Sequence, residues 1–222
     1  MIEYKNMSLA SQVFERLEKN ILTGVYAPGE VISEKRLTAE LGVSRTPIRE
    51  ALGRLMEDGL VSDSPSGTVV LGITPQDVDD TYEIKRRIEG YAGRMAAENM
   101  TDEQIKELRD ILDQQEFYMG KEDAEKVGDL DTRFHDAIYE NCGSRAFARI
   151  LSPLHHKLMK YRRISLETDL DRMRSSLKEH EGIVKALSAR DADAMEKAML
   201  AHVDGAHDGM VRGISLKEAE AK

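Results

Sequence analysis

Hydrophobic residues recur every three or four positions along most of the chain, and this spacing predicts amphipathic helices. Residues 8–23 carry one such stripe, and Gly24 follows as a residue that can take the left-handed conformation in which many helices end. After residue 74 the same period continues. Its interruptions predict about six helices, near residues 75–98, 102–118, 122–140, 144–164, 169–188 and 191–212. The fold class is therefore predicted as mainly α, with an all-α bundle in the C-terminal part.

Two shorter helices are predicted between Ser33 and Gly59, separated by a turn of three residues. Ser33 and Ser44 are good N-caps for these helices, and Gly42 allows a sharp turn between them. Helix, short turn and helix is the spacing of a DNA-binding helix-turn-helix. The N-terminal part of the chain is thus a candidate nucleic-acid-binding domain.

Residues 60–71 contain two short β-prone runs on either side of Ser64-Pro65-Ser66-Gly67, which predicts a β-hairpin wing. Three helices precede this hairpin. We therefore predict a winged helix-turn-helix over residues 1–73 and an all-helical domain over residues 74–222.

Three local features of the second domain carry expectations of their own. Thr101-x-x-Gln104 has the form of a capping box, in which two side chains satisfy backbone groups at a helix start. Pro153 is expected to interrupt the helix predicted at residues 144–164. The charged tail SLKEAEAK is expected to fray.

Composition narrows the class of protein without naming a function. The 222 residues are 41% hydrophobic and 33% charged, as expected of a folded protein. No apolar run approaches the roughly 20 residues of a membrane span, so we predict a cytoplasmic protein without membrane contact. The single cysteine, Cys142, excludes an intramolecular disulfide framework and a four-cysteine zinc site within this chain.

The net charge of −9 is unusual for a DNA-binding protein. The first 75 residues contain 8 Lys and Arg against 10 Asp and Glu, so most of the negative charge lies in the second domain. The local placement of basic side chains decides phosphate contact, and the total charge does not. The charge distribution therefore permits DNA binding.

Arg45, Thr46 and Arg49 cluster at the start of the second helix of the predicted helix-turn-helix. Free backbone N–H groups and the positive end of the helix dipole suit that position to phosphates and base edges. Alone, these arginines would be interpreted as a solvated helix face. Their coincidence with the helix-turn-helix and the wing favours DNA contact, through guanine or through phosphate.

Four side chains of the second domain are candidates for metal binding. Asp131 and His135 are four residues apart, hence on one helical face, while His180 and His202 follow apolar neighbours that point inward. Three imidazoles and a carboxylate suit zinc and several other divalent ions. Each residue alone would be interpreted as a hydrogen-bonded core group or a solvated one. The remaining histidines have no matching candidate ligands around them and are interpreted as structural or surface residues: His155, His156 and His207.

The stretch GVYAPGEVISEKRLTAELGVSRTPIREALGRLMEDGLV, residues 24–61, resembles the signature of the GntR family of bacterial regulators. The resemblance implies an operator contact by Arg45, Thr46 and Arg49, with Gly67 at the wing tip over the minor groove. The family usually has an arginine at the position of Lys35, which meets a phosphate without the planar fork of a guanidinium. Adjacent Arg36 is an alternative for that contact.

The second domain resembles the FCD type of the FadR branch, and its compact set of about six helices resembles the VanR-like subgroup. The motif is carried by residues 131–135 (DTRFH), by Glu179-His180 and by His202. The resemblance implies that Asp131, His135, His180 and His202 bind one divalent metal ion per chain, with zinc first and nickel, manganese or another ion as alternatives.

The FCD resemblance also implies a small carboxylate effector, held by the metal and by basic side chains. Lys85 stands where the family often has an effector-binding arginine, and Arg133 is a second candidate. Arg86 and Arg87 are further alternatives. All of these arginines would otherwise be interpreted as exposed or ion-paired.

The combined hypothesis is a homodimeric, sequence-specific transcription regulator that binds a pseudo-palindromic DNA operator and responds to a carboxylate effector. The resemblance implies that it is a repressor. One alternative keeps the DNA-binding domain and makes the metal purely structural. Another is a metal-dependent hydrolase or lyase. The sequence contains no H-E-x-x-H motif and no glycine-rich phosphate loop, and Glu179 and Glu181 point away from the face of His180. We therefore predict that the protein is not an enzyme.

Overall fold

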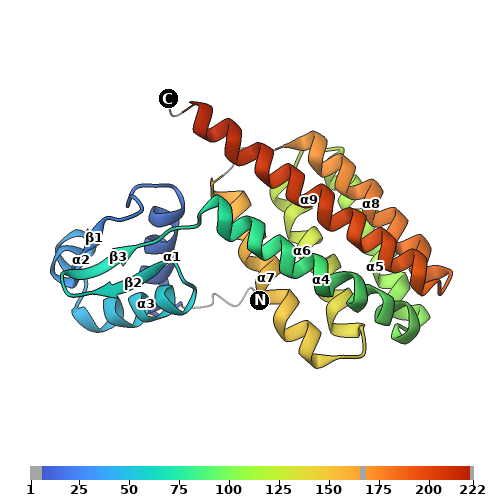
Figure 1. Cartoon of the computed structure of the whole chain (residues 1–222), viewed down its shortest axis with the longest axis horizontal. Helices are drawn as coiled ribbons and strands as arrows, with labels where there is room; N and C mark the ends of the chain where they lie inside the picture. The colour runs from blue at the N-terminus through green and yellow to red at the C-terminus, as the bar shows by residue number, and fades with distance from the viewer. Residues whose placement is uncertain (1–6, 166–168, 221–222) are drawn as a thin grey trace, which may run out of the picture. The chain divides into compact units, whose positions relative to one another are not determined.

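The computed structural model describes residues 7–165 and 169–220, and divides into two compact units, Met1–Thr74 and Pro75–Lys222. Both are mainly helical (Figure 1). Each unit has its own hydrophobic core. Within the described residues, no helix is both long enough and apolar enough to cross a membrane.

The N-terminal unit is a winged helix-turn-helix with a small antiparallel sheet, which confirms the predicted fold class. Its elements are α1 (Leu9–Leu22), β1 (Val31–Ile32), α2 (Glu34–Leu41), α3 (Arg45–Glu57), β2 (Val61–Ser64) and β3 (Gly67–Val70). The sheet has the order β1-β3-β2, so the wing gains a third strand that the sequence did not predict. A strand of two residues is too short for an alternating pattern, and pairing of Val31 with Val69 defines it.

Local signals fix the helix-turn-helix. The Ser33 hydroxyl accepts a hydrogen bond from the backbone N–H of Arg36 at 3.2 Å and so caps α2. Gly42 ends α2 with a φ of 67°, a conformation that favours glycine. Ser44 precedes α3 but makes no side-chain capping bond. The inner faces of α1 and α3 bury a shared apolar core, which includes Leu17, Ile21, Ile48, Leu52 and Leu55.

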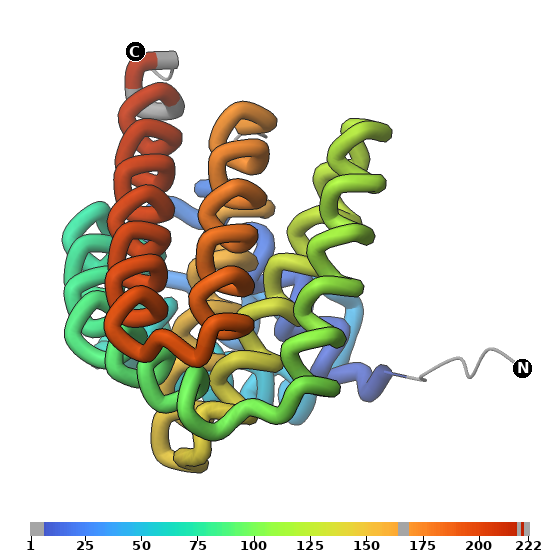
Figure 2. Tube along the Cα trace, turned by 90° about the vertical axis from the view of Figure 1, so that its right-hand side faces the viewer, coloured from blue at the N-terminus to red at the C-terminus, as the bar shows by residue number. Residues whose placement is uncertain are grey.

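The C-terminal unit is a bundle of helices, and Figure 2 shows several of them running side by side. Its helices are α4 (Pro75–Asn99), α5 (Asp102–Met119), α6 (Ala124–Asn141), α7 (Arg145–Ser165), α8 (Leu170–Ser188) and α9 (Ala192–Glu220). The six helices of the described residues confirm the prediction. α4 and α9 pack closely because α4 has glycine at the contact: a Cβ on Gly90 would lie 2.9 Å from Cγ of Leu200.

One local prediction for this unit was wrong and one is confirmed. Pro153 does not interrupt α7, which continues through it. Buried Leu151 and Leu158 on either side hold the helix against the bundle, which offsets the lost backbone hydrogen bond. α9 continues to Glu220, beyond the predicted end near residue 212, and the fraying expected of the tail stays a prediction. Both bonds of the capping box between Thr101 and Gln104 are present.

Candidate metal centre and nucleic-acid interface

Three histidines from three helices converge inside the C-terminal bundle. His135 comes from α6, His180 from α8 and His202 from α9, and none is more than 5% exposed. One ring nitrogen from each lies within 4.8 Å of the others. The closest approach joins Nε2 of His135 and Nε2 of His202, at 3.1 Å.

Each of these imidazoles uses its outer nitrogen, Nδ1, for a protein oxygen. Nδ1 of His202 lies 2.7 Å from Oε2 of Glu179, and Nδ1 of His180 lies 3.2 Å from Oε1 of Gln115. Nδ1 of His135 lies 3.1 Å from the hydroxyl of Tyr139. An ionised carboxylate only accepts hydrogen bonds, and so does an amide oxygen. The Tyr139 hydroxyl donates its own proton to Glu89 and so accepts from His135. We therefore assign the ring protons to Nδ1, which leaves the Nε2 lone pairs facing inward.

This arrangement fits a metal ion. Two Nε2 lone pairs at 3.1 Å repel each other unless a proton or a cation lies between them. Two nitrogens bound to one ion at about 2.0–2.1 Å would be about 3.0–3.4 Å apart, depending on the angle between them. Nε2 of His180 is fully buried and has no hydrogen-bond partner within the described residues, an orphan that coordination would satisfy. Outer hydrogen bonds that fix the tautomer are typical of metal-binding histidines.

Asp131, on α6 one turn before His135, supplies the oxygen of the candidate ligand set. Its side chain is 14% exposed, and Oδ1 lies 3.6 Å from Nε2 of His180. The structure thus brings together all four side chains that the sequence proposed as ligands. Whether they hold a metal remains a prediction.

Burial sets the protonation states that a metal would require. It lowers the pKa of His180 well below the usual value, with a further contribution from neighbouring His202, and it also lowers the pKa of His202. Burial would raise the pKa of Asp131, but contact with His155 and the neighbouring imidazoles hold that pKa well below its usual value. Neutral imidazoles and an ionised carboxylate are the forms that bind divalent ions.

A buried arginine clamps the outer partner of His202. Both terminal nitrogens of Arg172 lie 2.7 Å from the carboxylate of Glu179, which in turn accepts from His202. Two glycines of α9 leave room for this pair: a Cβ on Gly205 would lie 2.9 Å from Glu179 Oε1, and one on Gly209 would lie 3.0 Å from Arg172 Cδ. The clamp fixes the ring of His202.

Glu179 was not among the residues that the sequence proposed for the site. As expected, it does not share the inward face of His180, but it reaches the histidine of the next helix instead. Its position directly before His180 gave no sign of this contact, because its partner His202 lies on another helix, 23 residues further along the chain. Glu181 is exposed, also as expected.

A second buried network lies beside His135. Nζ of Lys85 lies 2.9 Å from Oε2 of fully buried Glu89, and the Tyr139 hydroxyl donates to Oε1 of Glu89 at 2.5 Å. Glu89 Oε1 is also 3.4 Å from Nδ1 of His135. Burial opposes the charge on Glu89, but Lys85 and His135 keep its pKa well below normal. The network places Lys85, an effector candidate, next to the metal candidates.

The other basic effector candidates lie outside this network. Arg133 is exposed, because it stands two residues from both Asp131 and His135 on the helix and so faces away from them. Arg86 and Arg87 form ion pairs with Glu83 near the surface. Their positions give no support for a contact with a ligand at the metal candidates.

One histidine interpretation was wrong. His155 of α7 is 5% exposed and joins the cluster: its ring centroid lies 4.3 Å from that of His135. Leu151 and Leu158 are buried on the same face of α7, so the apolar stripe around His155 was a signal for an inward position. His156 and His207 do lie apart, where they contact Asp136 and Asp79.

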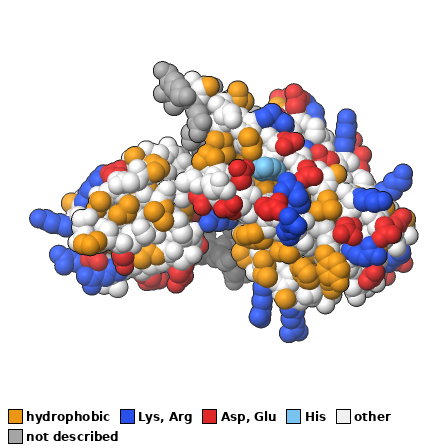
Figure 3. Space-filling model, in the orientation of Figure 1, with side chains coloured by type: hydrophobic (Ala, Val, Ile, Leu, Met, Phe, Trp, Pro, Cys, Tyr) orange, Lys and Arg blue, Asp and Glu red, His pale blue; other side chains and the backbone are white. Residues whose placement is uncertain are grey.

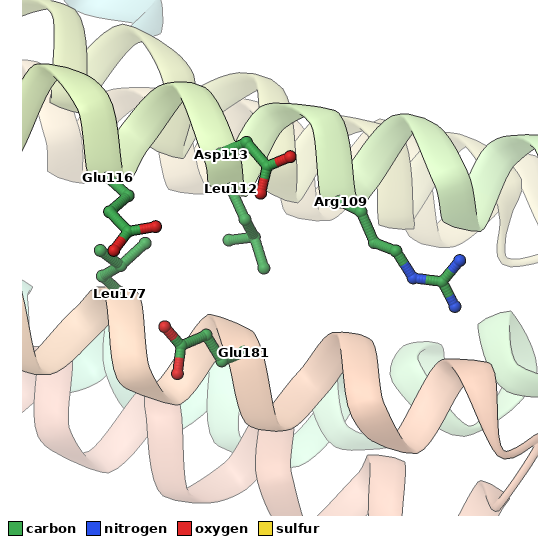
Figure 4. A pocket seen from close by; sticks show the side chains of 6 residues that line it. All are labelled: Arg109, Leu112, Asp113, Glu116, Leu177 and Glu181. Carbon is green, nitrogen blue, oxygen red and sulfur yellow. The ribbon is translucent and has the colours of Figure 1, made fainter.

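An open groove between α5 and α8 is a separate feature (Figure 4). Leu112 and Glu116 of α5 point across it toward Leu177 and Glu181 of α8 (Figure 4), and Arg109 and Asp113 complete its lining. These carboxylates are exposed to solvent and no histidine lines the groove. It does not share the buried donor geometry of the metal candidates.

The predicted DNA-contacting residues of α3 are exposed together at its N-terminal end. Arg45, Thr46 and Arg49 all face solvent. Nε of Arg49 lies 2.7 Å from Oε1 of Glu34 on α2, an ion pair that orients the guanidinium across the helix-turn-helix. Since Ser44 makes no side-chain capping bond, the first-turn amides keep their capacity to bind a phosphate.

Lys35 and Arg36 differ in their availability for DNA. Lys35 is exposed, whereas the guanidinium of Arg36 is held by Glu30 at 2.5 Å and by Glu40 at 2.6 Å. Arg36 would have to give up these exposed ion pairs to contact DNA, and its role as the alternative to Lys35 stays a prediction. Gly67 begins β3 beside the wing tip with a φ of 134°, and a Cβ there would lie 3.1 Å from the Ile32 carbonyl oxygen.

Two family models match the chain. The model described as bacterial regulatory proteins, gntR family, matches residues 9–70, and the FCD domain model matches residues 80–205. The uncharacterised HTH-type transcriptional regulator YdhC of Bacillus subtilis is 31% identical over 89% of this chain and 88% of its own. The gluconate operon transcriptional repressor of Bacillus licheniformis is 27% identical, over 85% and 79% of the two chains.

Among solved structures, E. coli McbR/YncC covers 97% of this chain and 100% of its own with a TM-score of 0.65 at 24% identity. This likeness supports the fold alone. The relatives are transcription regulators and not enzymes, in agreement with the sequence-based expectation. The chain thus belongs to the GntR family of bacterial regulators, in the branch with an FCD domain, and is a DNA-binding transcription regulator.

Proposed function

We propose that this regulator changes its affinity for a pseudo-palindromic DNA operator when a small carboxylate binds at a divalent ion held by Asp131, His135, His180 and His202. The observation that carries the proposal is the convergence of three Nε2 atoms whose Nδ1 partners are already satisfied. When bound, the ion would supply a Lewis-acidic centre for a carboxylate oxygen. Zinc comes first by ligand type, with nickel and manganese as alternatives.

The charges around the site favour an anionic effector. Two cations and three anions are bonded into the cluster: Lys85, Arg172, Glu89, Asp131 and Glu179. With neutral imidazoles their sum is −1, so a divalent ion would leave +1. A single carboxylate would neutralise this buried charge, and uncompensated buried charge is costly. A relative bears the name of a gluconate operon repressor, and gluconate is a sugar acid.

Repression that is relieved by the effector is the proposed sign of regulation. A relative of 27% identity is named a transcriptional repressor, and so is RspR of Escherichia coli at 30%. For the effector to act, it must bind more tightly to the state of the protein with low operator affinity. Lys85 is the proposed partner of the effector's second oxygen, since it belongs to the network beside His135.

Metal-loaded protein should release DNA on addition of a carboxylate, while metal-stripped protein should not. The probe is a duplex selected by the wild-type protein from a random-sequence library, and fluorescence anisotropy measures its affinity during titration with a panel of sugar and organic acids. We expect the responsive acid to weaken binding about 5- to 150-fold. An equal response by stripped protein, together with a lower melting temperature, would instead establish a purely structural metal.

A homodimer is the proposed binding unit, because a palindromic operator presents two half-sites. Apolar side chains gather on the outer face of α4 and α7, in part of the face shown in Figure 3. Ile84, Tyr91 and Ile150 are 46%, 53% and 50% exposed, and Tyr91 packs on Phe147 of α7. An apolar patch shared by two helices is a typical protein interface, and we propose a second copy of this chain as its partner.

The variant Tyr91→Arg/Ile150→Arg should therefore be monomeric. Charged groups in the centre of an apolar interface are desolvated without partners, at a cost of several kcal/mol. Light scattering should give twice the 25.0 kDa chain mass for the wild type and a single chain mass for the variant. Phe117→Arg, at a 56% exposed position on α5, is the matched control and should stay dimeric. A dimeric double variant would place the interface elsewhere.

A further inference from the structure

His155 lies beside Asp131, on a helix that carries none of the four proposed ligands. Its Nε2 is 3.4 Å from Oδ2 of Asp131, while Oδ1 of the same carboxylate is 3.6 Å from Nε2 of His180. Nε2 of His155 is fully buried and has no hydrogen bond of normal geometry within the described part of the chain. Asp131 thus lies between two imidazoles at similar distances.

Every proposed ligand has a second polar group that holds it from outside the site, and for Asp131 that group is His155. Each ligating histidine has an outer oxygen partner: Tyr139 for His135, Gln115 for His180 and Glu179 for His202. Carboxylate ligands are held in the same way by outer hydrogen bonds. With Oδ1 engaged in coordination, His155 is the partner that remains for Oδ2.

His155 lies on the side of the cluster where Asp131 is. Its ligand atom groups with those of Asp131 and His135, whereas His180 and His202 group with His135 and with each other. Its ring contacts are with His135, Tyr139 and His156. This placement suits a residue that acts through Asp131 better than a direct ligand.

We propose that His155 is the positioning residue of Asp131: its Nε2–H donates to Oδ2 and so directs Oδ1 to the metal. The inference rests on the proposed metal site and adds a residue to it. A histidine ring can carry the N–H donor that this role requires at Nε2. The neighbouring His156, whose side chain is 51% exposed, contacts Asp136 and has no part in this role.

The test is a titration of metal-stripped protein with Co²⁺, whose visible absorption reports the ligand set. His155→Leu removes the donor but retains an apolar side chain between Leu151 and Leu158, while His155→Gln keeps an N–H near the original position of Nε2. We expect His155→Leu to weaken Co²⁺ binding about 10- to 100-fold, as for other outer partners of metal ligands. His155→Gln should recover most of that loss, and His156→Ala should bind as the wild type does.

The spectrum of the saturated complex should be the same in all variants, because no ligand is lost. Circular dichroism of the metal-free forms verifies that each is folded. Equal affinities of His155→Leu and wild type overturn the positioning role, and so does equal weakening by Leu and Gln. A changed Co²⁺ spectrum in both variants makes His155 a direct ligand instead. If the wild type binds no Co²⁺, the metal site itself is refuted and His155 loses its role with it.

Discussion

Alanine at both Arg45 and Arg49 should lower affinity for the selected operator duplex by about 30-fold or more, because each arginine that grips a guanine or a phosphate contributes about 1–3 kcal/mol. Both side chains are exposed at the start of α3, where the backbone amides also point outward. Fluorescence anisotropy at several salt concentrations provides the measurement. Each phosphate contact that is lost should reduce the slope of log K against log salt by about 1.

Arg16→Ala/Lys19→Ala is the matched control for this experiment. Both residues are exposed on α1 and carry the same total charge as the arginine pair, but they lie outside the helix-turn-helix. We expect a small, salt-dependent effect from the control. An equally large loss in both double variants would show that general attraction, and not contact by α3, dominates binding.

Single variants separate the two arginines. Arg49 is oriented by Glu34, so Arg49→Ala should relax the preference at one base pair if it reads a guanine. Repeated selection with each single variant would measure that change. Unchanged selection with uniformly weaker binding would instead identify a phosphate contact.

The second large effect concerns metal content. Wild-type protein should contain about one divalent ion per chain, and His180→Ala/His202→Ala should contain almost none, since two of four ligands are lost. The loss of affinity should exceed the roughly 100-fold expected for an outer partner. Mass spectrometry of the dialysed proteins measures the stoichiometry.

His156→Ala/His207→Ala removes the same number of histidines from outside the cluster, where they contact Asp136 and Asp79, and should keep its metal. Melting curves of the metal-free forms establish that both double variants are folded. A folded wild type that contains no ion and takes none up would refute the metal centre. The DNA-binding role would be untouched, because it rests on residues of the other unit.

Short-range signals explain how much of the fold was predictable. Ser33, Gly42 and the Thr101–Gln104 box act within a few residues of the chain, so they identify helix ends directly. The hydrophobic period identified the helices of the bundle for the same reason. The prediction failed for β1 and at Pro153, where pairing with β3 and packing around Leu151 outweigh the local preference.

The candidate site was predictable in part. Asp131 and His135 share a helix face, and their spacing is visible in the chain, while His180 and His202 required either the family resemblance or a fold. His155 was misjudged in two respects. The apolar stripe of α7 indicated its inward position and was overlooked, while its contact with Asp131 of α6 could not be predicted from the local sequence. Arg133 was proposed because it is close in sequence to Asp131 and His135. Two residues along a helix change the direction of the side chain, so Arg133 is exposed on another face of α6.

Periodicity and caps act over short distances, so they were enough to predict the helical class and the helix-turn-helix with its arginines. The four metal-ligand candidates followed from local spacing together with the family resemblance. Which nitrogen of each imidazole is left for a ligand depends on packing between helices. Gln115 reaches His180 from α5, Glu179 reaches His202 from α8, and Glu89 of α4 takes the proton of Tyr139, so that this hydroxyl accepts from His135. Packing between helices also brings the Lys85–Glu89 pair of α4 against Tyr139 of α6, and the Arg172–Glu179 pair of α8 against His202 of α9. These contacts depend on the relative positions of whole helices, which packing of the shared core sets.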